Sequence, residues 1–210
     1  MSSEQAKLPP TQDRRVRRSR SVLIRAAMAL VSERGTTAIP ISDLAEAADV
    51  SRQLIYLQFG DRDTLFLAAA LELAEGELLP GLIDAPHPIA ERDQALAMAR
   101  HFADHRSFYR AMLTGSCAFA LNKMLTGLLT PVNAHFVHLM AGDRLAPDTV
   151  EDLAVFLTGG ASALFNAWVV EGSEPLDPEE FTDRLMRMAS VILASVAQPA
   201  NATQGKEFDR

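Results

Sequence analysis

Residues 41–65 read ISDLAEAADVSRQLIYLQFGDRDTL, and this stretch decides the fold. Apolar residues recur at i, i+3, i+4 and i+7 from Ile41, which predicts one short helix with a single apolar stripe. Ser51 then follows as a natural N-cap for a second short helix over residues 51–58. Two short helices joined by a few residues predict a helix-turn-helix, with the motif at about 41–59.

The second of these helices presents a polar edge. If Val50, Ile55 and Phe59 point inward, the other side chains, Gln58 included, face outward. Arg forms bidentate hydrogen bonds to guanine and Gln to adenine, and a Tyr hydroxyl can donate to a phosphate. The side chains expected to face a DNA duplex are Ser51, Arg52, Gln53, Leu54, Tyr56 and Leu57.

The stretch resembles the signature of the tetracycline-repressor (TetR) family of bacterial regulators. Ala-x-x-Val-Ser, Tyr-x-x-Phe and a basic residue three positions after that Phe occur in one register, and the resemblance covers about residues 17–77. It implies a DNA-binding head and a larger helical body that binds an effector and forms a homodimer. It also implies that Arg52, Gln53 and Leu54 face the major groove, and that Tyr56 and Arg62 contact phosphates.

Several positions depart from the family pattern, and among them Ile39-Pro40 replaces the usual hydroxyl residues before the helix at Ile41. Asp49 stands where the family usually has the glycine of the turn, Gln58 replaces the usual His, and Arg62 replaces the usual Lys. Because Asp tolerates a left-handed backbone better than most residues, we expect the turn to survive. These departures predict different operator details, not a different function.

Charge is distributed unevenly along the 210-residue chain. The formal net charge is -7, which is unfavourable for a nucleic-acid binder. Residues 1–62 nevertheless hold ten Lys and Arg against seven Asp and Glu, whereas the remainder holds ten against twenty. This asymmetry is expected where only one end meets a polyanion. We expect Arg20, at the start of the folded helix, to contact DNA, whereas Arg14 and Arg15 fit either a DNA contact or a soluble tail.

Helical periodicity continues almost throughout and predicts an all-α protein with about nine helices. One helix is expected from Asp61 to Leu79, ended by Pro80-Gly81, and a later break at Thr130-Pro131. The expected organisation is a flexible basic arm at 1–16, a helix-turn-helix domain at 17–77, an effector-binding and dimerisation domain at 78–198 and a disordered tail at 199–210.

Two sets of residues are expected to carry the functions of the body. Apolar walls with a few polar groups suit a small apolar or amphipathic effector. The candidates are His101, His105, Phe108, Tyr109, Cys117, Phe119, Asn122, Phe136 and Trp168. The last two helices, at about 147–171 and 177–197, are expected to form the dimer interface through Leu157, Gly160, Ala161, Leu164, Leu185, Met188 and Ile192.

We expect no metal and no cofactor. Cys117 is the only cysteine, which excludes a Cys-rich zinc module and fits a reducing cytoplasm. His101 with His105, and His135 with His138, have spacings that could place two imidazoles on one ion, but neither pair has a Cys partner or a helical His-Glu motif. The apolar stretch at 153–170 contains two glycines and an asparagine, so a buried helix is expected and no membrane contact.

These observations predict a cytoplasmic, ligand-responsive repressor that binds a palindromic double-stranded operator as a dimer. One alternative is a DNA-binding adaptor whose body binds a protein partner and no small molecule. A cavity in the body would favour a ligand, and a filled body would favour a protein partner. An enzyme is the rival from another class, but the sequence has no Gly-x-Ser-x-Gly on a strand, no phosphate-binding Gly-rich loop and no convincing pair of catalytic carboxylates.

Overall fold

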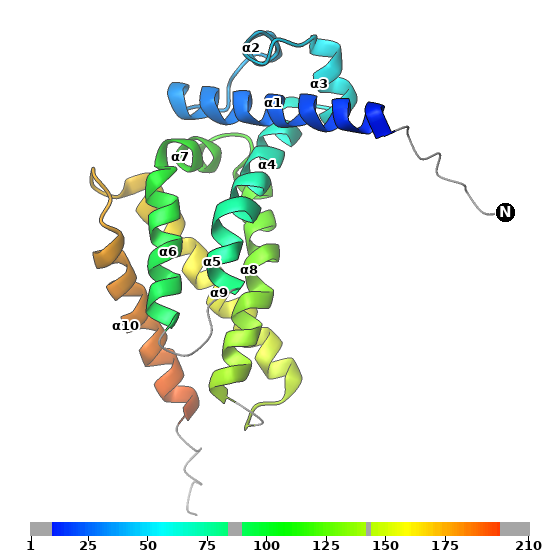
Figure 1. Cartoon of the computed structure of the whole chain (residues 1–210). Helices are drawn as coiled ribbons and strands as arrows, with labels where there is room; N and C mark the ends of the chain where they lie inside the picture. Colours follow the sequence, from blue (N-terminus) through cyan, green and yellow to red (C-terminus); the bar gives the residue numbers. More distant parts are fainter. Residues whose placement is uncertain (1–9, 84–89, 142–143, 198–210) are drawn as a thin grey trace, which may run out of the picture.

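Three N-terminal helices form a head, namely α1 (Pro10–Arg34), α2 (Ile41–Ala47) and α3 (Arg52–Phe59). The computed structural model describes residues 10–83, 90–141 and 144–197. In Figure 1, α1 lies across one end of the remaining helices, with α2 and α3 on its far side. The head therefore exposes α2 and α3 away from the rest of the chain.

The helices of the head contribute to one apolar core that continues into the body. Side chains from all three helices are buried there, among them Leu23, Leu44 and Ile55, each with 0% exposure. At the end of α1, Gly35 has a φ of 62° and its N–H donates to the carbonyl oxygen of Val31 at 3.0 Å. Because this left-handed conformation favours glycine, α1 ends at Arg34, just before Gly35.

The N-terminal arm is helical earlier than predicted. α1 begins at Pro10 and not near Arg17, so residues 10–16 belong to the helix. The arginines expected on a flexible arm that lie in this part of the chain are therefore carried by a helix. The rest of that arm, residues 1–9, and the predicted tail at 199–210 lie outside the described residues.

The helix after Asp61 is longer than predicted. Asp61 caps this helix, since its carboxylate accepts a hydrogen bond from the Thr64 backbone N–H at 2.7 Å. α4 (Arg62–Leu73) continues into a π-helical turn, η1 (Ala74–Leu78), and then into α5 (Leu79–Ile83). The prediction that Pro80-Gly81 ends the helix is wrong. A proline is tolerated in the first turn of a helix, and here a new α-helix starts one residue before Pro80.

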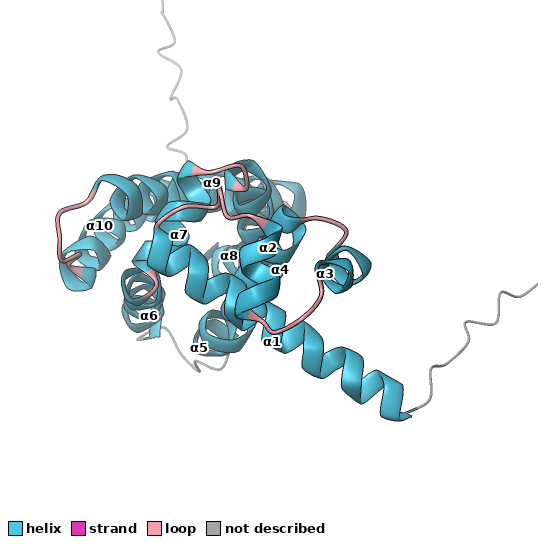
Figure 2. Ribbon diagram, turned by 90° about the horizontal axis from the view of Figure 1, so that it is seen from above, coloured by secondary structure: helices cyan, strands magenta, loops and turns pink. Residues whose placement is uncertain are grey.

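The regular elements in the described residues of the body are all helices, which confirms the all-α prediction. Figures 1 and 2 show the long helices running side by side beneath the head. The elements that follow α5 are α6 (Ala90–Asp104), α7 (Arg106–Thr114), α8 (Ala118–Ala141), α9 (Pro147–Glu171) and α10 (Pro178–Ala197).

The predicted break at Thr130-Pro131 is also wrong, because α8 runs through Pro131. The proline removes one intrahelical hydrogen bond. Leu125 and Val137, on either side of it, are buried at 7% and 1% exposure. Burial of both flanks therefore holds the helix together where the local sequence favours a break.

α7 connects the head to the body. It packs against α1 on one side and against α8 and α9 on the other. At its end, a Cβ atom added to Gly115 would overlap the Thr37 hydroxyl and lie 2.9 Å from the Ala111 carbonyl oxygen. Thr37 belongs to the loop between α1 and α2 and is 3% exposed. The absence of a side chain at Gly115 therefore allows the close approach of head and body.

Arg106, the first residue of α7, holds the end of α9. Its guanidinium donates to the carbonyl oxygens of Val169 at 3.0 Å, Gly172 at 2.6 Å and Ser173 at 3.2 Å. The last carbonyls of a helix have no intrahelical partner and carry partial negative charge. Only 14% of the Arg106 side chain is exposed, so water cannot easily replace these hydrogen bonds.

We predict that Arg106→Ala lowers the free energy of unfolding by about 3 kcal/mol, the upper end for hydrogen bonds to a charged group. Arg106→Lys should recover only part of this loss, because one ammonium group cannot reproduce the planar fork of donors. Chemical denaturation at pH 7 measures the change. Arg110→Ala, at an exposed position of the same helix, is the control and should stay close to the parent protein.

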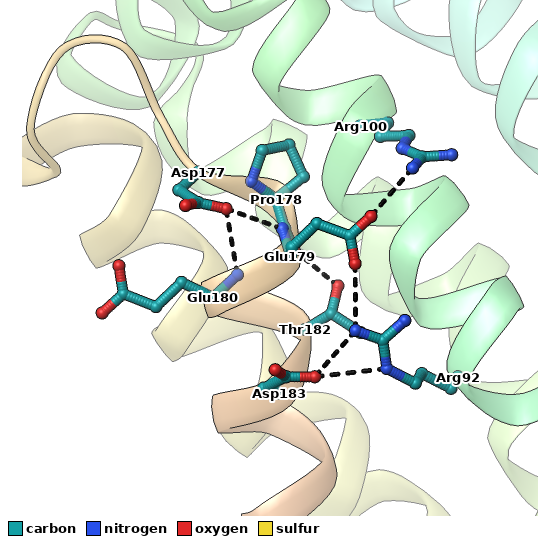
Figure 3. Close-up of polar contacts among 8 residues, drawn as sticks. All are labelled: Arg92, Arg100, Asp177, Pro178, Glu179, Glu180, Thr182 and Asp183. Carbon is teal, nitrogen blue, oxygen red and sulfur yellow. Dashed lines mark hydrogen bonds and ion pairs between the residues drawn. The ribbon is translucent and has the colours of Figure 1, made fainter.

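α10 starts at a side-chain cap. Figure 3 shows that the Asp177 carboxylate accepts hydrogen bonds from the backbone N–H groups of Glu179 at 2.9 Å and Glu180 at 3.0 Å. Asp177 is therefore the N-cap that fixes the first turn of α10.

Two arginines of α6 then meet this turn. Arg92 pairs with Glu179 at 2.9 Å and Asp183 at 2.8 Å, and Arg100 pairs with Glu179 at 2.9 Å (Figure 3). All four side chains are exposed, so each pair contributes little stability by itself. Together they set how α10 lies against α6, and both helices form walls of the cavity described below.

Candidate DNA-binding surface and ligand cavity

The turn between α2 and α3 has the geometry of a helix-turn-helix. Asp49 has a φ of 51°, the one described non-glycine residue with a positive φ. The Val50 N–H donates back to the Ala45 carbonyl oxygen at 2.9 Å and closes the turn. Asp49 therefore adopts the left-handed backbone conformation at the position where the family usually has a glycine, as the sequence predicts.

α3 presents the polar edge that the sequence predicts. The Ser51 hydroxyl accepts a hydrogen bond from the Leu54 N–H at 3.3 Å and caps the helix. Ile55 and Phe59 are buried at 0% and 7% exposure and fix α3 on the head. The exposed residues are Ser51, Arg52, Gln53, Tyr56 and Leu57, and Leu54 is half-buried. The groups suited to reading base edges therefore share one free face.

Gln58 differs from its predicted outward position. Its side-chain amide donates to the Ser19 hydroxyl of α1 at 2.7 Å, and its buried carbonyl oxygen has no hydrogen-bond partner. Next to it, the Arg20 guanidinium lies 4.5 Å from the centre of the Phe59 ring. Gln58 and Arg20 thus orient α1 against α3. The Arg20 side chain remains exposed near α3.

Arg62 already has partners inside the head. It donates to the Ile39 carbonyl oxygen at 3.2 Å and pairs with Asp63 at 3.2 Å. The loop before α2 is therefore held by the residue for which a phosphate contact is predicted. A phosphate contact by Arg62 stays a prediction.

Basic side chains also line α1. Arg14, Arg17, Arg18 and Arg20 are all exposed along this helix. These arginines belong to the same head as α3. The basic N-terminal part of the sequence therefore lies at one end of the molecule (Figure 1). This is the charge placement that a duplex-binding surface requires.

The body encloses a cavity of about 390 Å³ among α6, α8, α9 and α10. Apolar side chains make most of its wall, including Met98, Phe102, Phe136, Leu157 and Phe165. This volume lies within the range of small-molecule sites. No Lys, Arg, Asp, Glu or His of the described residues lines it.

The polar groups of the cavity are amides and hydroxyls, and four of them form two hydrogen-bonded pairs. Asn166 donates to the Asn122 side-chain oxygen at 2.7 Å, and Asn133 donates to the Thr158 hydroxyl at 2.7 Å. Thr158 itself donates to the Ala154 carbonyl oxygen at 2.7 Å. The cavity therefore offers a few oriented, uncharged hydrogen-bonding groups on an apolar wall.

The structure places only some of the predicted pocket residues at this cavity. Asn122 and Phe136 line it, and the other seven do not. His101, Phe108, Tyr109 and Cys117 are buried elsewhere, Phe119 is 82% exposed, and the Trp168 ring stacks on Phe181 with centroids 4.2 Å apart. His105 instead contacts Glu77. Helical periodicity identifies a buried face but not which part of the core is left empty.

The predicted interface residues also lie at the cavity. All seven line it, and only Gly160 and Met188 are exposed as well. The exposed apolar stripe of α9 lies on another face, at Val155, Gly159, Ala163 and Ala167, spaced four residues apart. Because α9 is apolar nearly all round, its periodicity alone does not distinguish the inward face from the outward one.

This exposed stripe explains why α9 resembles a membrane helix. Of the described helices, α9 alone is long and apolar enough to cross a membrane, and 22% of its apolar window is buried within the chain. The sequence predicts a buried helix here, and a single copy of the chain does not bury it. On α10, Met188 and Val191 add exposures of 49% and 66%. These two helices together present an apolar surface.

The comparisons agree with this geometry. A family described as bacterial regulatory proteins, tetR family, matches residues 23–69. The HTH-type transcriptional regulator AlkX of Mycobacterium tuberculosis is 33% identical over 117 residues, which are 54% of this chain and 48% of that protein. This alignment therefore spans about half the length of the relative.

Solved structures extend the likeness over the body. One is the TetR family repressor AlkX from a Dietzia strain, implicated in biodegradation of n-alkanes. It has a TM-score of 0.57 at 25% identity, over 84% of this chain and 98% of that chain. A TetR-like transcriptional regulator from a Rhodococcus strain shares the fold, with a TM-score of 0.55 at 20% identity over 90% of this chain and 99% of that chain.

Proposed function

We propose that this chain, which belongs to the tetR family of bacterial regulatory proteins, is a cytoplasmic, ligand-responsive repressor that binds a palindromic operator as a homodimer. The observation that carries the proposal is the exposed edge of α3, where Arg52, Gln53 and Tyr56 share one face of a capped helix. The N-terminal end of such a helix fits the major groove, with Arg and Gln against base edges.

The dimer forms through the exposed apolar stripe of α9 together with α10. Small side chains at Gly159, Ala163 and Ala167 let two helices approach closely. In a symmetric dimer each residue of the stripe meets the partner's stripe. Two heads on one palindrome then combine their affinities.

The ligand is an uncharged, mainly apolar molecule. The cavity favours this reading over a protein-binding adaptor, because a body that only contacts proteins needs no internal volume. Among the residues that the structure describes, its wall has no ionisable side chain to neutralise a charged ligand. The relation of one structural neighbour to n-alkane degradation makes alkanols and alkanes the first molecules to test.

A ligand in this cavity can act on the head. The exposed residues Phe156, Gly160 and Met188 lie at its open side, next to the stripe on α9. Arg106 ties the end of α9 to α7, and α7 packs against α1. A shift of α9 therefore changes the separation of two heads that must match a groove repeat of about 34–36 Å.

Selection of bound fragments from genomic DNA tests the proposal. A palindromic sequence should be enriched, and its affinity should fall steeply as the salt concentration rises. Equal recovery of all fragments at every salt concentration would contradict sequence-specific recognition.

A cavity-filling variant tests the ligand. We predict that Ala161→Phe keeps operator affinity but abolishes its loss on addition of 1-dodecanol, because the added ring occupies the space that the ligand needs. Fluorescence anisotropy with a labelled operator measures both quantities. Ser107→Phe, at an exposed position of α7, is the size-matched control and should respond as the parent does.

Dodecanoate should lower operator affinity less than dodecanol does, and the reverse order would contradict an uncharged ligand.

A further inference from the structure

Three potential metal ligands meet between the head and the cavity, outside both sites described above. Glu77 comes from η1, His101 from the last turn of α6, and His105 from the residue between α6 and α7. One ligand atom of each lies within 4.8 Å of the other two. The nearest Glu77 oxygen is 2.7 Å from His105 Nε2 and 3.6 Å from His101 Nδ1. Ligand atoms around a tetrahedral zinc ion stand roughly 3.4 Å apart, given bonds of about 2.0–2.2 Å.

His101 has an unsatisfied polar atom that faces this group. Its side chain is 5% exposed, and its Nδ1 is buried without a hydrogen-bond partner. Its Nε2 lies 2.8 Å from the Tyr109 hydroxyl. With the proton on Nε2, the imidazole donates to Tyr109 and leaves a lone pair on Nδ1. With the proton on Nδ1, the nearest acceptor is Glu77 at 3.6 Å, beyond hydrogen-bond distance. Neither tautomer satisfies Nδ1 within the protein, and a bound cation would satisfy the first.

The second ring nitrogen of His101 has a partner that suits metal binding by the first. The Tyr109 hydroxyl lies 2.8 Å from Nε2. A hydroxyl partner on the second ring nitrogen fixes the tautomer of a metal-bound histidine.

We propose that Glu77, His101 and His105 bind a first-row transition metal ion of the Zn²⁺ class, with Tyr109 orienting His101. Two imidazoles and one carboxylate suit Zn²⁺, whereas Mg²⁺ and Ca²⁺ prefer sites made of oxygen ligands. Three protein ligands leave a fourth position open for water. Because the Glu77 side chain is 53% exposed, the ion enters from solvent.

The position of the site gives the ion a structural consequence. η1 continues from α4, the helix that follows the head in the chain. Turns of π-helix recur at functional sites. His105 stands at the junction from which α7 runs along α1. A bound ion therefore fastens the end of α4 to the junction of α6 and α7.

Titration of the full-length protein with ZnCl₂ tests the site, with isothermal calorimetry for affinity and native mass spectrometry for stoichiometry. We expect one Zn²⁺ per chain and no displacement by excess MgCl₂. Glu77→Gln and His105→Gln should each weaken binding at least about tenfold, since even outer partners of a metal site contribute that much. Both positions are on or near the surface, so these variants are expected to fold, and circular dichroism checks this.

Matched controls separate this site from adventitious binding. Glu75→Gln changes an exposed carboxylate of the same η1 turn, and His138→Gln changes an exposed histidine of α8. Both should bind zinc as the parent does. Absence of zinc binding, or equal binding by the parent, Glu77→Gln and His105→Gln, would overturn the proposal. DNA is not needed for any of these measurements, so their outcome is independent of the proposed repressor function.

Discussion

Gly159→Arg is expected to convert the dimer into a monomer and to lower operator affinity by about 10²–10⁴, the gain that a second linked binding site supplies. Gly159 is exposed at the middle of the α9 stripe, and an added Cβ atom meets nothing within 4 Å. The single chain therefore accommodates the arginine, and a glycine-to-arginine change even favours the helix. In a symmetric dimer, two guanidinium groups would be buried close together in an apolar seam without a counter-charge.

Analytical ultracentrifugation measures the change in mass, and anisotropy with the selected operator measures the change in affinity. Gly127→Arg is the matched control. Gly127 is an exposed position within α8 that also has nothing within 4 Å of an added Cβ atom, and it follows the exposed Lys123 by one turn. It should stay dimeric. A dimeric Gly159→Arg protein would mean that the stripe on α9 is not the seam.

The exposed stripe and the cavity mouth lie next to each other, and this arrangement bears on regulation. Phe156 and Gly160 line the cavity and are exposed. The residue before each of them, Val155 and Gly159 respectively, belongs to the stripe. A partner helix on the stripe therefore covers part of the opening. Ligand entry and dimer geometry would then be coupled through the same turns of α9, with a free energy of a few kcal/mol sufficient for switching.

The head could be predicted in detail because its determinants are local. The cap at Ser51, the inward-facing Ile55 and Phe59, and the left-handed turn at Asp49 are all set by residues within one motif. The start of α1 at Pro10 and the position of Gln58 are exceptions. The hydrogen-bond partner of Gln58 is Ser19, 39 residues away, and no local pattern indicates such a contact.

The body was predictable in class but not in detail. Pro80 and Pro131 both favour a break, yet tertiary packing carries the chain through in helical form. Single-sequence patterns measure local preference, whereas helices in proteins gain most of their stability from packing. The same limit explains why the faces of α9 could not be assigned, since nearly every position of that helix is apolar or small.

The histidine pairs show how a site can be missed from spacing alone. His101 and His105 have a spacing that allows a shared ion, but the third ligand, Glu77, lies 28 residues before His105 and on another element. The other pair, His135 and His138, is exposed, and within the described residues no group of three ligands includes it. Both pairs have a spacing that allows a shared ion, and only the fold separates them.

Arg52→Ala is expected to weaken operator binding by about 2–6 kcal/mol for the dimer, roughly 30-fold to 10⁴-fold, because each bidentate contact to a base contributes about 1–3 kcal/mol and the dimer makes it twice. Arg52 is exposed at the first position of α3, and Ile55 and Phe59 hold that helix without it. The variant should therefore keep the fold and the dimer.

Arg52→Lys should keep much of the salt dependence but lose preference for the contacted base, since an ammonium group attracts phosphates without reproducing the bidentate geometry. Anisotropy with the selected operator and with single-base variants measures both effects, and Arg110→Ala on α7 is the matched control. If Arg52→Ala weakens all duplexes equally, Arg52 contacts only phosphates, and if it changes nothing, α3 does not enter the groove.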